Sequence, residues 1–171
     1  MSLRRSVRHG LLWLAVLGLS VAHAAGPPPR VDVTFVDTER YVDAGDGAAE
    51  QRQNLGELER QLRRLGSQVT PPGQRLRLEI TQVDLAGRLL PFVGGRGAQP
   101  TRVLDGGADW PRIDLRWQRV GSDGEVIGRG DASIDDKTYL QRRLPTSGID
   151  RLPYEQRMLA EWFTRTFGAS K

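Results

Sequence analysis

Carboxylate side chains are the groups in this chain with the clearest catalytic potential. A glycoside hydrolase needs two of them, one as an acid and the other as a base or nucleophile. Six acidic residues fall at predicted strand ends, turns or helix starts, namely Glu79, Asp84, Asp109, Asp135, Asp136 and Glu155. Their spacing brings no two together, and the many arginines offer each of them an ion-pair partner. A carboxylate-dependent hydrolase is therefore one hypothesis, and helix capping or ion pairing is the alternative.

Imidazole and thiol chemistry is confined to the N-terminal end of the chain. The only two histidines are His9 and His23, and there is no cysteine. A domain that starts after residue 24 has no Ser-His-Asp or Cys-His nucleophile. It also has no zinc site of the usual imidazole or thiolate type and no disulfide. We therefore expect no metal and no cofactor.

One stretch imitates the beginning of a calcium-binding loop. Asp131, Ser133 and Asp135 alternate as the first ligands of an EF-hand do. The sixth position is Asp136 instead of glycine, and the twelfth is Arg142 instead of glutamate. The EF-hand interpretation fails, and helix capping explains the acidic residues better.

Two further motifs are incomplete. Gly94-Gly95-Arg96-Gly97 lacks the Gly-Lys-Ser/Thr of a phosphate-binding loop, and its dinucleotide-type spacing ends at Pro100, so we expect a flexible hairpin loop. Ser133 precedes Lys137 by four residues instead of three, which excludes the Ser-x-x-Lys nucleophile pattern.

The first 24 residues have the three parts of a secretory signal peptide. Arginines 4, 5 and 8 precede an apolar run over residues 11–19, which is followed by Ala22-His23-Ala24. Ala22 and Ala24 predict cleavage after Ala24. The run is too short for a spanning helix, so no transmembrane segment is expected in the mature chain. Three of the 25 basic residues and none of the 21 acidic ones leave with the signal. The nearly neutral remainder gives no reason to expect nucleic-acid binding.

The mature part has the length of one domain, with a flexible lead-in over residues 25–30 and a domain over residues 31–171. Alternating residues predict strands at 31–36, 76–85, 101–104, 113–117 and 126–134, with a change of apolar parity between Ile80 and Val83 that indicates a bulge. Small residues, among them Gly128 and Gly130, leave one face of the last strand nearly bare, so a helix or backbone can approach it.

Helical spacing predicts two main helices. Leucines at steps of three and four mark a helix from about Ala48 that Gly66 is placed to end. A second helix is expected from about Pro153 to Phe167, and Asp135 or Asp136 can cap a short helical piece. These elements predict an α+β fold: a single two-layer domain with an antiparallel or mixed sheet of about five strands and both helices on one face.

The candidate residues for a functional surface fall at predicted strand ends and loops, where binding residues concentrate. They are Asp84, Trp110, Arg112, Asp136 and Tyr139. We expect Trp110 to be exposed or hinge-like, because it precedes Pro111 in a loop, and Trp117 and Trp162 to be core residues.

Several segments together resemble a bacterial family known as domain of unknown function 3016. They are Val31–Val36 with Tyr41-Val42-Asp43, Pro72–Leu76, Val83-Asp84-Leu85-Ala86-Gly87, Arg102-Val103-Leu104, Asp109–Ile113, and Leu152–Leu159 with Trp162-Phe163. The resemblance departs from the family pattern at Asp135-Asp136, where an Asp-Met pair is expected before the tyrosine region. It implies an exported proteobacterial protein, hence a periplasmic one, and supplies neither a reaction nor a site.

These observations favour a non-catalytic envelope protein that binds an envelope protein or a small ligand. A carboxylate-dependent hydrolase acting on an envelope substrate is the alternative, and a purely structural or stress-related stabilising protein is a third.

Overall fold

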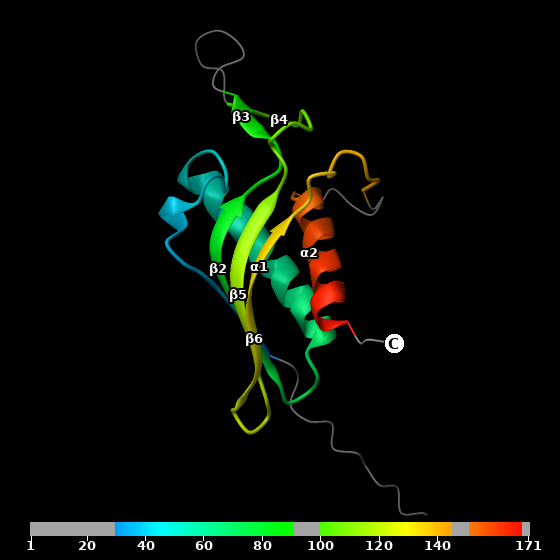
Figure 1. The fold of residues 1–171 in the computed structure, drawn as a ribbon. Helices are drawn as coiled ribbons and strands as arrows, with labels where there is room; N and C mark the ends of the chain where they lie inside the picture. The colour runs from blue at the N-terminus through cyan, green and yellow to red at the C-terminus, as the bar shows by residue number, and fades with distance from the viewer. Residues whose placement is uncertain (1–29, 91–99, 145–150, 169–171) are drawn as a thin grey trace, which may run out of the picture.

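A computed structural model describes residues 30–90, 100–144 and 151–168. The domain has two layers, a twisted sheet and a pair of helices (Figure 1). The glycine-rich motif at residues 94–97 and the signal-like segment lie outside the described residues. Among the described helices, none is long and apolar enough to cross a bilayer.

The main sheet has four strands in the order β1-β2-β5-β6. They are β1 (Arg30–Phe35), β2 (Arg75–Asp84), β5 (Arg112–Val120) and β6 (Val126–Asp135). β1 runs parallel to β2, because α1 connects them, and the other neighbours are antiparallel. The register between β2 and β5 shifts between Ile80 and Gln82, which confirms the bulge predicted from the apolar parity.

Both main helices pack on one face of this sheet. α1 (Gly47–Val69) buries Leu58, Leu62 and Leu65, and α2 (Pro153–Phe167) buries the stripe that includes Met158, Leu159, Trp162 and Phe163. A short 3₁₀ helix, η1 (Thr38–Arg40), follows β1. The predicted α+β fold with two helices on one face is confirmed.

We expected Gly66 to end the first helix, but the helix continues to Val69. A Cβ atom at Gly66 would lie 3.0 Å from a methyl of Val31 and 3.2 Å from one of Leu76. The glycine instead allows the helix backbone to lie close against β1 and β2.

A two-stranded hairpin projects beyond the main sheet (Figure 1). It consists of β3 (Arg88–Leu90) and β4 (Thr101–Val103). β4 is one residue shorter than the strand that we predicted over residues 101–104.

The prediction of a short helix starting at Asp135 or Asp136 is wrong. The chain after β6 forms turns instead, in which the N–H of Tyr139 donates to the carbonyl of Asp136 and the N–H of Gln141 donates to that of Thr138. Asp136 caps the first of these turns, accepting hydrogen bonds from the backbone and hydroxyl of Thr138.

The bare face of β6 accommodates a side chain from the next strand. A Cβ atom at Gly130 would lie 3.0 Å from the indole Nε1 of Trp117, so the indole takes the space that we assigned to a helix or backbone. Trp117 also meets Phe167 edge to face at 5.0 Å. Trp117 is half-buried against the core and Trp162 is buried, as predicted.

Candidate functional site

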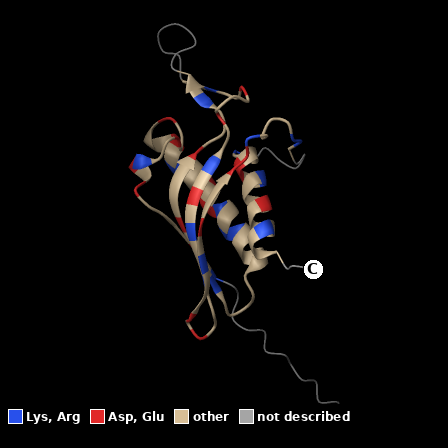
Figure 2. Ribbon diagram, viewed as in Figure 1, with Lys and Arg blue, Asp and Glu red and all other residues tan. Residues whose placement is uncertain are grey.

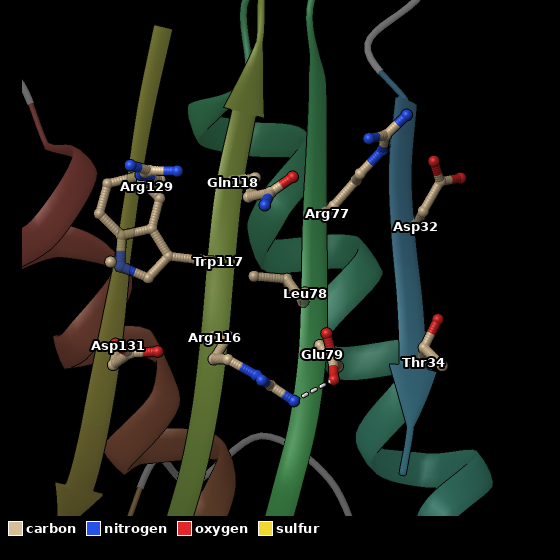
Figure 3. Close-up of a pocket in the computed structure, with 11 residues that line it drawn as sticks. Asp32, Thr34, Arg77, Leu78, Glu79, Arg116, Trp117, Gln118, Arg129 and Asp131 are labelled. Carbon is tan, nitrogen blue, oxygen red and sulfur yellow. Dashed lines mark hydrogen bonds and ion pairs between the residues drawn. The ribbon is translucent and has the colours of Figure 1, made fainter. Parts of the chain in front are cut away.

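The sheet face opposite the helices has no covering layer in the described structure. Alternate strand residues point to it, and the helices lie behind the strands when it is viewed directly (Figure 3). We call this surface the open face. Eight polar side chains form its centre, namely Asp32, Thr34, Arg77, Glu79, Arg116, Gln118, Arg129 and Asp131.

The strand register arranges these side chains in two rows that cross all four strands. One row runs Asp32, Arg77, Gln118, Arg129, and the next runs Thr34, Glu79, Arg116, Asp131. Both charge signs recur along the strands (Figure 2). The rows line a hollow of about 660 Å³, which is within the range of small-molecule sites.

Only some of these charges are paired with each other. Arg116 donates a hydrogen bond to Glu79 across the strands, and Asp32 lies 3.0 Å from Arg30 and 3.6 Å from Arg75. Arg77 is exposed, and its side chain leans toward β1 in Figure 3. Within the described part of the chain, Arg77, Arg129 and Asp131 have neither an ion pair nor a side-chain hydrogen bond. Their charges are therefore available to a molecule that binds the open face.

Two residues predicted from the sequence lie at the far end of the open face. Asp84 ends β2 and is paired in the register with Arg112, which begins β5. Burial and the neighbouring Asp43 carboxylate raise the pKa of Asp84. Arg112 is exposed, and its guanidinium donates hydrogen bonds to Asp114 at 3.1 and 2.9 Å, which raise its pKa.

Trp110 is half-buried in the loop before β5. The Nζ atom of Lys137 lies 5.5 Å from the centre of its ring, a cation–π contact. This places Trp110 beyond the end of the open face and beside the turns that follow β6.

Asp136 and Tyr139 are buried, so the prediction that they belong to a binding surface is corrected. Asp136 accepts a hydrogen bond of 2.8 Å from Arg157, and only 8% of the residue is exposed. Burial acts to raise the pKa of Asp136, but hydrogen bonds from Arg157 and Thr138 lower it overall. The Tyr139 hydroxyl donates to Asp109 Oδ2 at 2.9 Å, and burial raises its pKa to about 12. Both side chains join secondary-structure elements inside the domain.

A second polar cluster lies where the hairpin leaves the sheet. Arg102 of β4 donates to both carboxylate oxygens of Asp43 and also to the carbonyls of Ala86 and Gly87. Glu155 of α2 accepts the backbone N–H of Ala86 at 2.7 Å and is 1% exposed. Burial raises the pKa of Glu155, and its Oε2 atom has no hydrogen-bond partner among the described residues. This cluster ties four distant segments together.

The acidic residues considered for hydrolysis are mostly engaged in internal bonds. Glu79 is bonded to Arg116, Asp109 to Tyr139, Asp136 to Arg157, and Glu155 to a backbone N–H. Among the described residues, no group of three or more acidic or histidine side chains is placed to hold a metal ion.

Sequence reasoning missed the centre of the open face. The signal was present in the strand alternation, since Arg77, Glu79, Arg116 and Gln118 are the polar partners of the apolar residues that defined β2 and β5. Alternation identifies which residues share a face of one strand, but the strand order decides which of them meet.

Four of the segments that resemble a known family meet in the second polar cluster, through Asp43, Ala86, Arg102 and Glu155. A family model described as "Protein of unknown function (DUF3016)" matches residues 29–165, most of the chain. No curated protein and no solved structure matches the chain. On this match over most of its length, the chain belongs to the family of domain of unknown function 3016.

Proposed function

We propose that this protein is a non-catalytic binding protein of the periplasm, and that its open face contacts an envelope ligand or partner. The observation that carries the proposal is the uncovered sheet face with charges that have no partner within the described chain. A sheet with helices on one side only leaves its second face free for another molecule.

The chemistry of the first row favours an anionic group on the ligand. The Arg77 guanidinium is a fork of donors that matches a carboxylate or phosphate. Gln118 is the register partner of Arg77 on the next strand, so its amide can contact the same ligand. The adjacent Glu79 and Asp32 would interact with a cationic group on the same ligand. A partner with both charge signs therefore fits this surface best.

Export to the periplasm is the second part of the proposal. Its support is the arginine-rich start, the short apolar run and Ala22-His23-Ala24. Mass spectrometry of the protein from a periplasmic fraction should find an N-terminus at Ala25. A full-length protein that begins at Met1 and stays in the cytoplasm would contradict export.

Hydrolysis is less well supported than binding. A general acid and a nucleophile must both reach the substrate, whereas most of the acidic residues are held by arginine, tyrosine or backbone donors. Among the carboxylates that the structure describes, Asp84 alone combines partial exposure with a raised pKa, and its neighbour Asp43 is paired with Arg102.

The test compares two matched double variants of the mature protein. Arg77→Ala/Gln118→Ala removes two side chains from the open face, and Arg52→Ala/Gln53→Ala removes the same two types from the exposed surface of α1. Immobilised wild-type protein is used to capture molecules from envelope extracts, and titration calorimetry then measures the affinity of each captured molecule.

We expect the open-face variant to bind at least about tenfold more weakly, a loss of about 1.4 kcal/mol, while the α1 variant binds like the wild type. Equal affinity of both variants would show that binding occurs elsewhere. Chemical conversion of a captured molecule, abolished by Asp84→Asn, would favour the hydrolase.

A further inference from the structure

The outer edge of β6 is the open edge of the main sheet. β6 is last in the strand order and has ten residues, a length of about 33 Å. No other described strand pairs with its outer side. Such an edge presents unpaired N–H and C=O groups and readily pairs with another strand.

The opposite edge, formed by β1, is shorter and protected. It has six residues, and Arg63 of α1 donates a hydrogen bond to the carbonyl of Val31. Long arginine side chains over an edge are one means by which proteins prevent strand addition. β6 has no equivalent cover among the described residues.

The backbone geometry shows which residues of β6 face outward. The N–H of Asp136 points to β5, where it donates to the carbonyl of Pro111 at 3.3 Å. Since successive residues of a strand direct their N–H and C=O groups to opposite sides, Ile134, Ala132 and Gly130 also face β5. The backbone groups of Ser133, Asp131 and Arg129 therefore point to the open edge.

We propose that two copies of this protein pair through their β6 strands, antiparallel and around a two-fold axis at Gly130. In this register Arg129 lies opposite Asp131 of the second copy, and Asp131 lies opposite Arg129 of the second copy. The outward N–H and C=O groups of these residues bond to each other, and their side chains form two ion pairs on the open face. The product is one continuous sheet of eight strands.

Charge selects this register over its neighbours. An axis at Arg129 places two arginines opposite each other, and an axis at Asp131 places two carboxylates opposite each other, which is unfavourable. An axis at Ala132 leaves Asp131 opposite Ser133. Only the axis at Gly130 pairs both charges, and neither charge has a partner within its own described chain.

In this arrangement the helix layers of the two copies lie on the same face of the joined sheet. Each copy places two helices over four strands, and strands lie about 4.8 Å apart whereas packed helices lie 8–10 Å apart, roughly twice that spacing. Extending the sheet across β6 brings the α2 helix of each copy next to the interface, on the same side of the sheet. On that face Gly130 has no side chain, and Trp117 of the same chain lies over it.

The test measures the mass of the mature protein by sedimentation equilibrium over a range of concentrations. We expect a dimer for the wild type, and at least about tenfold weaker dimerisation for Arg129→Glu and for Asp131→Arg, because each places like charges opposite each other. The double variant Arg129→Glu/Asp131→Arg exchanges the charges and should recover the wild-type dissociation constant to within about threefold.

Two further variants separate this interface from general effects. Arg77→Glu makes the same charge change on β2, away from the edge, and should leave the dimer intact. Ser133→Pro removes an outward N–H without removing a bond to β5, and should weaken the dimer while circular dichroism shows a folded chain. A wild-type monomer at every concentration overturns the proposal. Failure of the double charge exchange to recover dimerisation overturns it as well.

Discussion

Arg102 forms a bidentate ion pair with the carboxylate of Asp43. Nη1 lies 2.8 Å from Oδ2 and Nη2 lies 2.9 Å from Oδ1. The backbone of Asp43 is bonded to Val83 and Leu85 at the end of β2. Through this pair the hairpin strand β4, the loop after β1 and the end of β2 become one unit.

Replacing Arg102 by alanine should therefore destabilise the domain. The side chains of Arg102 and Asp43 are 23% and 15% exposed, and the change leaves a mostly buried carboxylate close to Asp84. We expect a loss of about 1–3 kcal/mol in the free energy of unfolding, measured by urea titration. The control is Arg88→Ala, whose ion pair with Asp105 is on the surface. Equal effects of both changes would contradict a structural role for the Asp43–Arg102 pair.

Two tyrosines in edge-to-face contact provide a matched comparison. The Tyr139 hydroxyl donates to buried Asp109, whereas no hydrogen bond of the Tyr154 hydroxyl is found among the described residues. Tyr139→Phe should lower the free energy of unfolding by about 1–3 kcal/mol, because it leaves Asp109 without this donor. Tyr154→Phe should change it little. Thermal and urea unfolding of both variants test this, and a larger loss for Tyr154→Phe would be the contrary result.

Two glycines of α1 should respond to alanine in opposite directions. At Gly66 a new Cβ meets Val31 and Leu76 at 3.0–3.2 Å, so Gly66→Ala should cost about 1–3 kcal/mol through overpacking. At Gly56 the nearest atom is Arg60 Nη1 at 3.8 Å, so Gly56→Ala should stabilise by about 0.5–1 kcal/mol through helix propensity. If Gly66→Ala proved stabilising as well, the close approach of α1 to β1 would be refuted.

The buried Glu155 should make stability depend on pH. Burial raises its pKa above the ordinary value of 4.5, so the folded state holds the proton more tightly than the unfolded state. This contribution to stability is fully present below that value and is lost as the pH rises through the raised pKa. Glu155→Gln cannot titrate, and its amide oxygen can still accept the N–H of Ala86.

The free energy of unfolding of Glu155→Gln relative to the wild type should therefore increase with pH, by at most about 1.4 kcal/mol per pH unit. Urea titrations from acid to neutral pH measure this difference. Glu125→Gln, at an exposed turn, controls for the loss of one negative charge. A pH-independent difference between Glu155→Gln and the wild type would contradict the assignment.

Local sequence patterns determined the elements of this protein. Leu58 and Leu62 mark the buried side of α1, Leu76, Leu78 and Ile80 mark that of β2, and the parity change after Ile80 marks the bulge. These features depend on residues within a few positions of each other, where helical and strand periods are visible. The same patterns predicted both helices on one face.

Tertiary structure alone decided which distant residues meet. Asp136 and Tyr139 have the appearance of loop residues, yet Arg157 and Asp109, far away in the chain, hold them inside the domain. Arg77 and Gln118 share the open face only because β5 pairs with β2 in one register. Strand order and register depend on contacts of the whole chain, and for that reason the site emerged only from the folded arrangement.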